Sequence, residues 1–166
     1  MGQLLNGKGK VGIIDYPALQ SVVARVDGFK EGLAATPDVK IVSIQTGITR
    51  AEALTVAQNM LQAHPDLDGL FGFGDDAALA AVIAAKSARN DTIKIIGFDG
   101  MPEARDAVDA EKTLVAVIRQ FPDQMGTKAL DAAVDHPNGK LVAQLIPVAP
   151  AAYAQTKHET AYGAAG

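Results

Sequence analysis

Asp99 occupies the position in this sequence that is best suited to binding chemistry. It follows the mainly aliphatic segment 93–98, whose β-branched residues are typical of a strand buried on both faces. A Gly-Met-Pro sequence comes next and indicates a turn into a helix. Ligands of open parallel α/β sheets bind just outside the carboxyl ends of the strands, where Asp99 offers two acceptor oxygens. The alternative is that Asp99 only caps the next helix or stabilises its turn.

Further polar residues near expected strand ends or helix starts are Arg25, Asp75, Asp76 and Gln120. Their side chains suit hydrogen bonding, and no serine has a patterned histidine base beside it. The segment 15–18 after the first expected strand lacks the glycines and the lysine of a phosphate-binding loop. The histidines fall at an expected helix end, a turn and the C-terminal tail, which disfavours a metal site. We therefore expect a binding protein rather than an enzyme, with no metal ion and no cofactor.

Composition narrows the class of partner. A chain of 166 residues suits one domain, and its net charge of −4 without a basic cluster disfavours nucleic acid. No uncharged apolar run approaches the roughly 20 residues needed to cross a bilayer, so we expect no membrane insertion. Cysteine is absent, which excludes disulfides and thiol catalysis. The first residues lack the apolar core of a signal peptide, so we expect no signal peptide in this chain.

Short apolar runs alternate with helical patterns along the chain. Strands are expected at residues 10–15, 40–44, 67–73, 93–99, 114–118 and 141–148. Helices are expected around residues 22–33, 50–63, 79–86, 104–108 and 123–134, where apolar residues recur mainly at three- and four-residue spacing. This alternation predicts an α/β fold, with a doubly wound, mainly parallel sheet and helices on both of its faces. Residues 1–150 are expected to form a single α/β lobe, and residues 151–166 a tail.

Several segments resemble, in order, the ribose-binding-protein branch of the type I periplasmic solute-binding proteins. These segments are residues 11–15, 25–29, 57–66, 95–100 and 118–126, within a resemblance that covers most of residues 7–150. The resemblance implies a flavodoxin-like lobe that closes with a second lobe over a sugar, and a periplasmic or other extracytoplasmic location. The same fold is the sugar-binding core of lac-repressor-type regulators, which the lack of a DNA-binding segment here disfavours.

The resemblance also implies roles for individual residues. Arg25 would donate in a fork to ring or hydroxyl oxygens, Asp99 would accept from two hydroxyls, and Gln120 would both donate and accept. Tyr16 and Asp76 belong to the same expected ligand-binding set.

The remaining two members of that set, Gly74 and Ile48, depart from the family pattern. Gly74 replaces an asparagine, so either Asp76 or Phe73 compensates or the ligand differs in stereochemistry or size at that point. Ile48 replaces an aromatic residue that covers the sugar ring, and its aliphatic side chain covers less of that ring. The neighbouring Asp75 matches a common family aspartate, which we expect to cap the following helix.

The expected helix around residues 123–134, within the segment 121–140, belongs in the family to an N-terminal lobe that this sequence lacks. Its apolar side, formed by Met125, Ala129, Leu130 and Ala133, is therefore expected to lack its usual partner. The expected partners are that lobe and an ABC permease in the parent protein, or a second copy of this chain. We expect weak or no sugar binding by the isolated lobe. The alternative is a stand-alone interaction or oligomerisation module without a ligand role.

Overall fold

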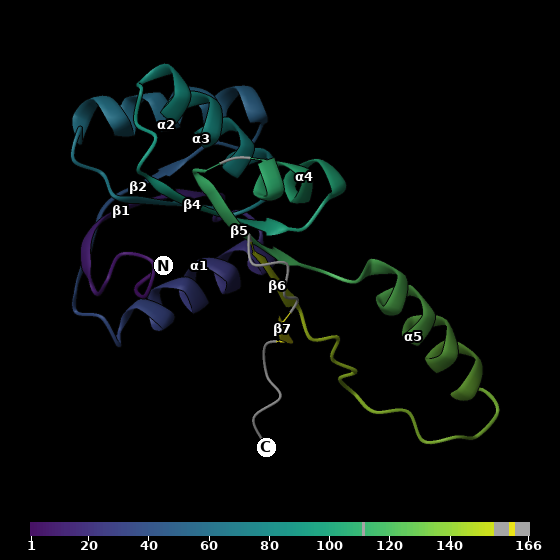
Figure 1. Cartoon of the computed structure of the whole chain (residues 1–166). Helices are drawn as coiled ribbons and strands as arrows, with labels where there is room; N and C mark the ends of the chain where they lie inside the picture. The colour runs from purple at the N-terminus through teal and green to yellow at the C-terminus, as the bar shows by residue number, and fades with distance from the viewer. Residues whose placement is uncertain (111, 155–159, 162–166) are drawn as a thin grey trace.

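A single mixed sheet forms the centre of the molecule (Figure 1), which is described here from a computed structural model of residues 1–110, 112–154 and 160–161. The described residues form a seven-stranded sheet in the order β2-β1-β3-β4-β5-β6-β7. The strands are β1 Lys8–Asp15, β2 Asp38–Thr46, β3 Gly69–Gly72, β4 Lys94–Asp99, β5 Leu114–Arg119, β6 Ala151–Ala154 and β7 Thr160–Ala161. Strands β1 to β5 are parallel, whereas β6 and β7 pair antiparallel at one edge. The mainly parallel sheet is confirmed.

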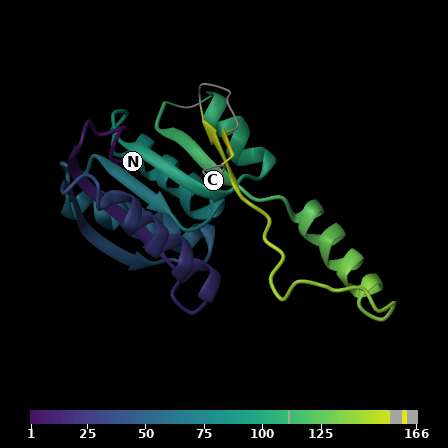
Figure 2. The same ribbon diagram turned by 90° about the horizontal axis from the view of Figure 1, so that it is seen from below.

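Helices cover both faces of this sheet, as predicted. They are α1 Gln20–Leu33, α2 Arg50–Ala63, α3 Asp75–Ser87, α4 Pro102–Ala110 and α5 Pro122–Asp135. Helix α1 lies on one face, and α2, α3 and α4 lie on the other (Figure 1). Helix α5 extends away from these layers in both ribbon views (Figures 1 and 2). Among the described residues, no helix combines the length and the apolar character that a membrane span requires.

The central strands bury side chains on both faces because successive residues point in opposite directions. In β1, Ile13 packs in the cluster under α1 while its neighbour Ile14 packs in the cluster under α2 and α3. In β3, Phe71 and Leu70 divide between the same two clusters. Continuous apolar strands of this kind are expected where a parallel sheet is covered on both sides.

Small residues bring α3 unusually close to the sheet. A Cβ on Gly72 of β3 would lie 2.7 Å from the backbone nitrogen of Ala78. A Cβ on Gly97 of β4 would lie 2.9 Å from the Cβ of Ala78. These distances are shorter than a side chain tolerates, so glycine is required for this contact. The close approach brings the first turn of α3 beside the end of β4, where Asp99 lies.

The prediction of the C-terminal strand was wrong. Residues 141–148, predicted as a strand, form no regular structure, and Leu141 and Leu145 are largely exposed. The strand instead covers Ala151–Ala154, inside the predicted tail, and pairs with β5 through Arg119↔Ala151 to Ala116↔Ala154. Pairing with β5 satisfies backbone groups that a free sheet edge would leave open. Of the predicted tail, residues 155–159 and 162–166 lie outside the described residues.

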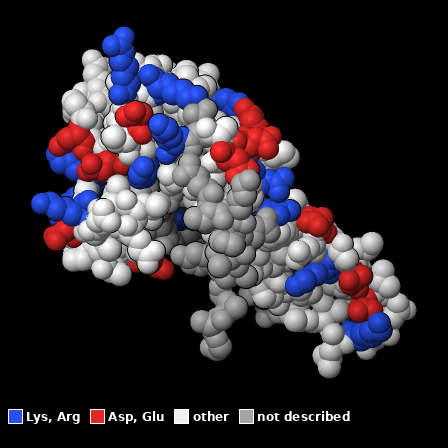
Figure 3. All heavy atoms as spheres, in the orientation of Figure 1, with Lys and Arg blue, Asp and Glu red and all other residues white. Residues whose placement is uncertain are grey.

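Helix α5 forms where the sequence predicted it, but none of its residues is buried. Met125, Leu130 and Val134 are 38%, 66% and 52% exposed. On the face seen in Figure 3, acidic and basic side chains are interspersed over the layered region and along α5. The helix therefore presents apolar side chains within an otherwise mixed, charged surface.

Truncation of a core leucine should test this assignment of the core. Leu70 in β3 is 1% exposed, so Leu70→Ala should lower the free energy of unfolding by about 2–5 kcal/mol through lost burial and a residual cavity. The matched control is Leu145→Ala, because Leu145 is 79% exposed and its loss should change stability by less than about 0.5 kcal/mol. Urea unfolding measures both values, and equal effects would contradict the assigned core.

Candidate ligand-binding site

Three side chains predicted to bind ligand converge at the carboxyl edge of the sheet. Asp99 ends β4, Gln120 follows β5, and Arg25 comes from α1. The Gln120 Nε2 donates to Asp99 Oδ1 at 2.6 Å, and Arg25 Nη1 lies 3.1 Å from the same oxygen. The structure thus brings the three residues together as the sequence predicted, although their role toward a ligand stays a prediction.

Arg25 is fixed by more than its ion pair. Its Nη1 donates to the backbone oxygen of Phe73 at 2.8 Å, and its guanidinium lies 4.2 Å from the centre of the Phe98 ring. Only 16% of the Arg25 side chain is exposed. A guanidinium stacked on an aromatic ring and bonded at its edge keeps one orientation. The direction of the Arg25 donors is therefore fixed by the protein itself.

Sequence reasoning missed Phe98 as the support of Arg25, although a signal for it was present. Phe98 and Ile96 are two residues apart in β4, so they face the same side of the sheet. Both pack against the cluster beneath α1, the helix that carries Arg25. Strand alternation combined with the position of α1 could have identified this contact.

Asp99 has an unusual backbone conformation. Its φ is +113°, which residues with a side chain rarely adopt, and Gly100 follows with a φ of +74°. A Cβ on Gly100 would lie 2.7 Å from the Cα of Arg119, so this turn is packed against the end of β5. The backbone oxygen of Asp99 accepts a hydrogen bond from the Gln120 nitrogen at 2.9 Å. Strained conformations of this kind concentrate at functional sites, where surrounding contacts hold them.

Gly74 leaves an opening beside the second oxygen of Asp99. A Cβ built on Gly74 would lie 3.2 Å from Asp99 Oδ2 and would meet no other atom within 4 Å among the described residues. Gly74 has a φ of −148°, a value that other residues also adopt. The glycine therefore matters for space next to the Asp99 carboxylate rather than for backbone conformation.

Asp76 lies in the first turn of α3 but engages a different group. Arg50 Nε donates to Asp76 Oδ1 at 2.8 Å, while Arg50 Nη1 and Nη2 each donate to Glu103 at 2.8 Å. This ion-pair network joins the starts of α2, α3 and α4, and the Arg50 guanidinium lowers the pKa of Glu103. The described contacts of Asp76 thus lie outside the Arg25–Asp99–Gln120 cluster, and its ligand role stays a prediction.

Tyr16 and Ile48 supply apolar surface at the same edge of the sheet. The Tyr16 ring follows β1 and lies 6.1 Å from the Phe73 ring, measured between centroids. Ile48 follows β2 and is 49% exposed. Its backbone nitrogen donates to Glu52 Oε2 at 3.0 Å, as part of the capping interactions that begin α2 at Thr49. Ile48 is therefore presented on a fixed backbone.

Asp75 does not cap α3, so that prediction was wrong. The N-cap of α3 is Gly74, and no side chain caps it. Asp75 is instead 1% exposed, and its Oδ2 accepts a hydrogen bond from the backbone nitrogen of Met101 at 2.6 Å. Burial is the main cause that raises the pKa of Asp75 to about 6, while hydrogen bonds from the Met101 and Gly100 amides lower it. The nearby charge of Asp99 raises this pKa further.

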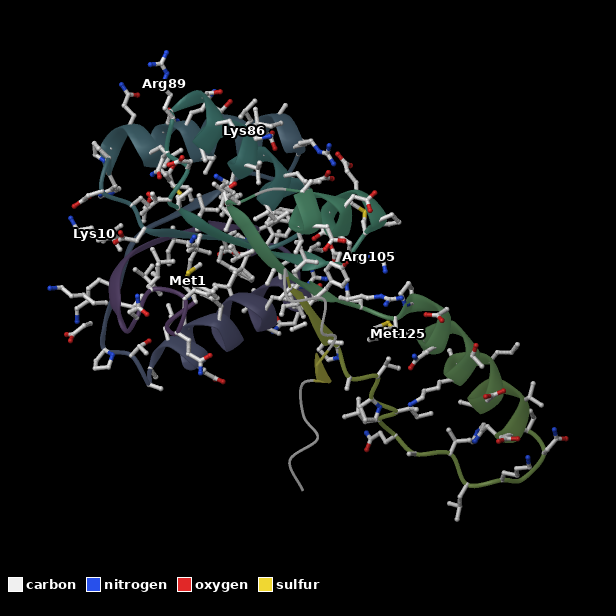
Figure 4. The ribbon with its side chains drawn as sticks, in the orientation of Figure 1. Met1, Lys10, Lys86, Arg89, Arg105 and Met125 are labelled. Atoms are coloured by element: carbon white, nitrogen blue, oxygen red, sulfur yellow. The ribbon has the colours of Figure 1, made fainter. Side chains whose placement is uncertain are left out.

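The Asp99 side chain is 35% exposed, so solvent reaches part of the cluster around it. A hollow of about 440 Å³ lies at the opposite end of α3, lined in part by Ala85, Arg89 and Thr113. In Figure 4, Arg89 extends away from the body of the protein, so its charge is not directed into a closed cavity. Among the described residues, no group of three or more potential metal-binding side chains occurs. The Asp99 cluster is thus a partly exposed set of hydrogen-bond donors and acceptors at one edge of the sheet.

Comparisons with known proteins find relatives for most of this chain. A family model described as periplasmic binding protein domain matches residues 1–141. The ribose import binding protein RbsB of Escherichia coli (strain K12) is 36% identical over 124 residues, which are 75% of this chain and 42% of that protein. The D-allose-binding periplasmic protein of the same organism is 32% identical over 138 residues, which are 81% of this chain and 44% of that protein.

Solved structures match almost the whole of this chain. An ABC transporter periplasmic solute binding protein from Actinobacillus succinogenes 130z, with bound D-allose, superposes with a TM-score of 0.89 at 28% identity, covering 94% of this chain and 55% of that one. The Caulobacter myo-inositol binding protein, bound to myo-inositol, gives a TM-score of 0.84 at 32% identity, covering 93% and 54%. This chain therefore spans about half the length of the proteins it matches.

Removal of the Arg25 guanidinium should cost more stability than removal of the exposed Arg50 guanidinium. Arg25→Met removes the donor to the half-buried Phe73 oxygen and leaves Asp99 Oδ1 with Gln120 as its remaining donor, so the free energy of unfolding should fall by about 1–3 kcal/mol. Arg50→Met breaks exposed ion pairs and should cost about 0–1 kcal/mol. Urea unfolding compares the two variants, and a larger loss for Arg50→Met would contradict this ranking.

Proposed function

This chain belongs to the periplasmic binding protein domain family, in its ribose-binding-protein-like branch, and on that premise we propose that it is one lobe of a sugar-binding protein. The lobe corresponds to the C-terminal half of a two-lobed protein that delivers a sugar to an ABC importer. Its partners are the N-terminal lobe and the membrane permease of that importer, and its location is periplasmic. The span of about half of each relative supports this assignment.

The observation that carries the proposal is the convergence of Arg25 and Gln120 on Asp99. Sugar hydroxyls both donate and accept hydrogen bonds, so a site for them needs an acceptor, a donor and a group that does both. Asp99 accepts, Arg25 donates and Gln120 does both, and they meet within 3.1 Å of one carboxylate oxygen. Tyr16 and Ile48 at the same edge cover apolar faces of the ring.

The substrate class is a monosaccharide or a cyclic polyol. Curated relatives are named for ribose, D-allose and D-apiose, and a solved relative is bound to myo-inositol. The opening at Gly74 next to Asp99 Oδ2 admits a ring substituent there. The site binds and releases its ligand without chemical change, because its polar groups form hydrogen-bond partners rather than a nucleophile with a base.

The isolated lobe should bind sugar weakly. Binding pockets normally bury about 70–90% of a small ligand, and one wall leaves its hydrogen bonds in competition with water. We expect dissociation constants on the order of millimolar or weaker for D-ribose, D-allose and myo-inositol. Amide shifts in ¹H–¹⁵N spectra during titration with each sugar measure this, and they should cluster at Gly74, Asp99 and Gln120.

Two variants make this sugar titration specific. Asp99→Ala removes the shared acceptor and should abolish the shifts, whereas Asp91→Ala, an exposed aspartate beyond the far end of α3, should leave them intact. Micromolar affinity for the isolated chain would contradict the single-wall argument. Absence of sugar-dependent shifts at the cluster for all three sugars would contradict the sugar-binding role itself.

A stand-alone interaction module is the second candidate, and exposed helix α5 favours it. The helix buries none of its residues, Leu130 and Val134 form an apolar strip one helical turn apart, and Leu141 and Leu145 in the following segment are also exposed. In the parent protein this strip packs on the N-terminal lobe. When that lobe is absent, a second copy of the chain offers the same apolar surface.

The isolated chain should therefore self-associate through α5 as its concentration rises. Leu130→Glu places a charge in the apolar strip and should shift the chain toward monomer, because burial of an unpaired charge is unfavourable. Ile83→Glu on the outer side of α3, where Ile83 is 47% exposed, is the matched control and should leave association unchanged. Light scattering after size-exclusion chromatography measures the mass, and a monomer at every concentration would refute self-association.

A further inference from the structure

The turn that carries Asp99 is held from the side by Asp75. Asp75 opens α3, is 1% exposed, and accepts the Met101 N–H at 2.6 Å through Oδ2. The Gly100 amide also lies close enough to this carboxylate to lower its pKa. A backbone amide that donates to a buried carboxylate forms a stable contact, because a carboxylate is a strong acceptor for backbone donors. Asp75 therefore fixes the two residues that directly follow Asp99.

This turn needs such a contact because its backbone is strained. Asp99 and Gly100 have φ values of +113° and +74° in succession. Arg25 and Gln120 hold the side chain of Asp99, and the Gln120 nitrogen holds its backbone oxygen. On the other side of the turn, the Asp75 carboxylate accepts the hydrogen bond of the Met101 amide. Without that carboxylate, the contacts that stabilise the uncommon φ of Asp99 would be incomplete.

The fold maintains Asp75 in this place at an energetic cost. Its Oδ1 is buried and has no hydrogen-bond partner among the described residues. Gly97 provides the room, because a Cβ there would lie 3.1 Å from Asp75 Oδ1. A buried carboxylate oxygen without a donor disfavours the ionised form. The ionised form is nevertheless the one that binds the two amides most strongly.

The charged groups around Asp75 are few. Asp99 at the end of β4 and Asp76 on α3 are the acidic neighbours that disfavour its charge. Arg25 from α1 pairs with Asp99, and Glu103 of α4 pairs with Arg50. Arg119 ends β5 with its backbone against Gly100, and β3 consists of Gly-Leu-Phe-Gly without a titratable side chain. Burial is the larger influence, and together these groups bring the pKa of Asp75 to about 6.

We infer that Asp75 is the positioning residue for Asp99: its carboxylate holds the turn that presents Asp99, and its protonation weakens that hold. The consequence for ligand affinity rests on the sugar-binding role proposed above, whereas the consequence for the turn does not. As pH falls through about 6, the Met101 and Gly100 amides lose a charged acceptor. The Asp99 carboxylate then becomes less well oriented toward a ligand.

Protonation of Asp75 does not itself destabilise the fold. Because the pKa of Asp75 is higher in the folded chain than its usual value of 3.8, the folded chain binds the proton more tightly than the unfolded chain. The contribution of Asp75 to stability is therefore greatest at pH values below about 4 and is lost as pH rises through about 6. Protonation thus stabilises the fold while it weakens the contact with the turn, so the two effects have opposite signs.

A pH titration of the whole chain followed by ¹H–¹⁵N spectra tests the inference from about pH 8 to about pH 4.5. The amide protons of Gly100 and Met101 should move upfield together with a midpoint near 6. Asp75→Asn should remove this transition, because its amide oxygen has no charge to lose. Asp76→Asn, which removes an acidic charge from the same helical turn, should retain it. The inference is overturned if the unmutated chain lacks the transition or if Asp75→Asn keeps it.

A second arm separates the ligand consequence from the proposed function. D-allose titrations at about pH 7.5 and about pH 5 should give roughly five-fold weaker binding at the lower pH for the unmutated chain. Asp75→Asn should bind equally at both pH values. Equal affinity of the unmutated chain at both pH values would overturn the ligand consequence. If no sugar binds at either pH while the Gly100 and Met101 transition is present, the proposed function fails and the positioning role stands.

Discussion

The carboxylate of Asp99 is the contact on which the organisation of this lobe depends. Arg25 from α1 and Gln120 from the end of β5 both reach Asp99 Oδ1, so three segments far apart in sequence are joined at one atom. The parallel sheet makes this meeting possible, because strands that run the same way end at the same edge. A carboxylate shared by two donors is oriented in advance, and Oδ2 is left facing the opening at Gly74.

Close packing between α3 and the sheet extends this constraint. Gly72 and Gly97 allow the helix to approach until Ala78 touches both strands. This approach carries Asp75 beneath the turn that follows Asp99, where solvent cannot reach its carboxylate. Larger residues at either glycine would push the helix outward. The choice of small residues in the core and the presentation of Asp99 are therefore linked.

The sequence predicted well what local periodicity and chain order determine. The strands β1 to β5, the helices between them and the meeting of Arg25, Asp99 and Gln120 follow from alternation and parallel topology. The edge strand was misplaced because pairing of Ala151–Ala154 with β5 depends on contacts across more than 30 residues rather than on local pattern. Asp75 was misread for a related reason. Aspartate at a helix start usually caps it, and only the packing of α3 against β4 reveals Met101 as its partner.

The open wall and the exposed helix have one physical explanation. A binding site for a small polar ligand must be open to solvent before the ligand binds and must exclude water afterwards. A single rigid lobe cannot do both. In this lobe the polar groups are already bonded to one another, so little side-chain ordering remains to be done when a ligand arrives. What the lobe does not supply is burial, and its unburied α5 leads away from the same edge of the sheet. The fixed orientation of these polar groups is thus a property of this chain, and under the proposed function affinity would depend on a second surface that closes over them.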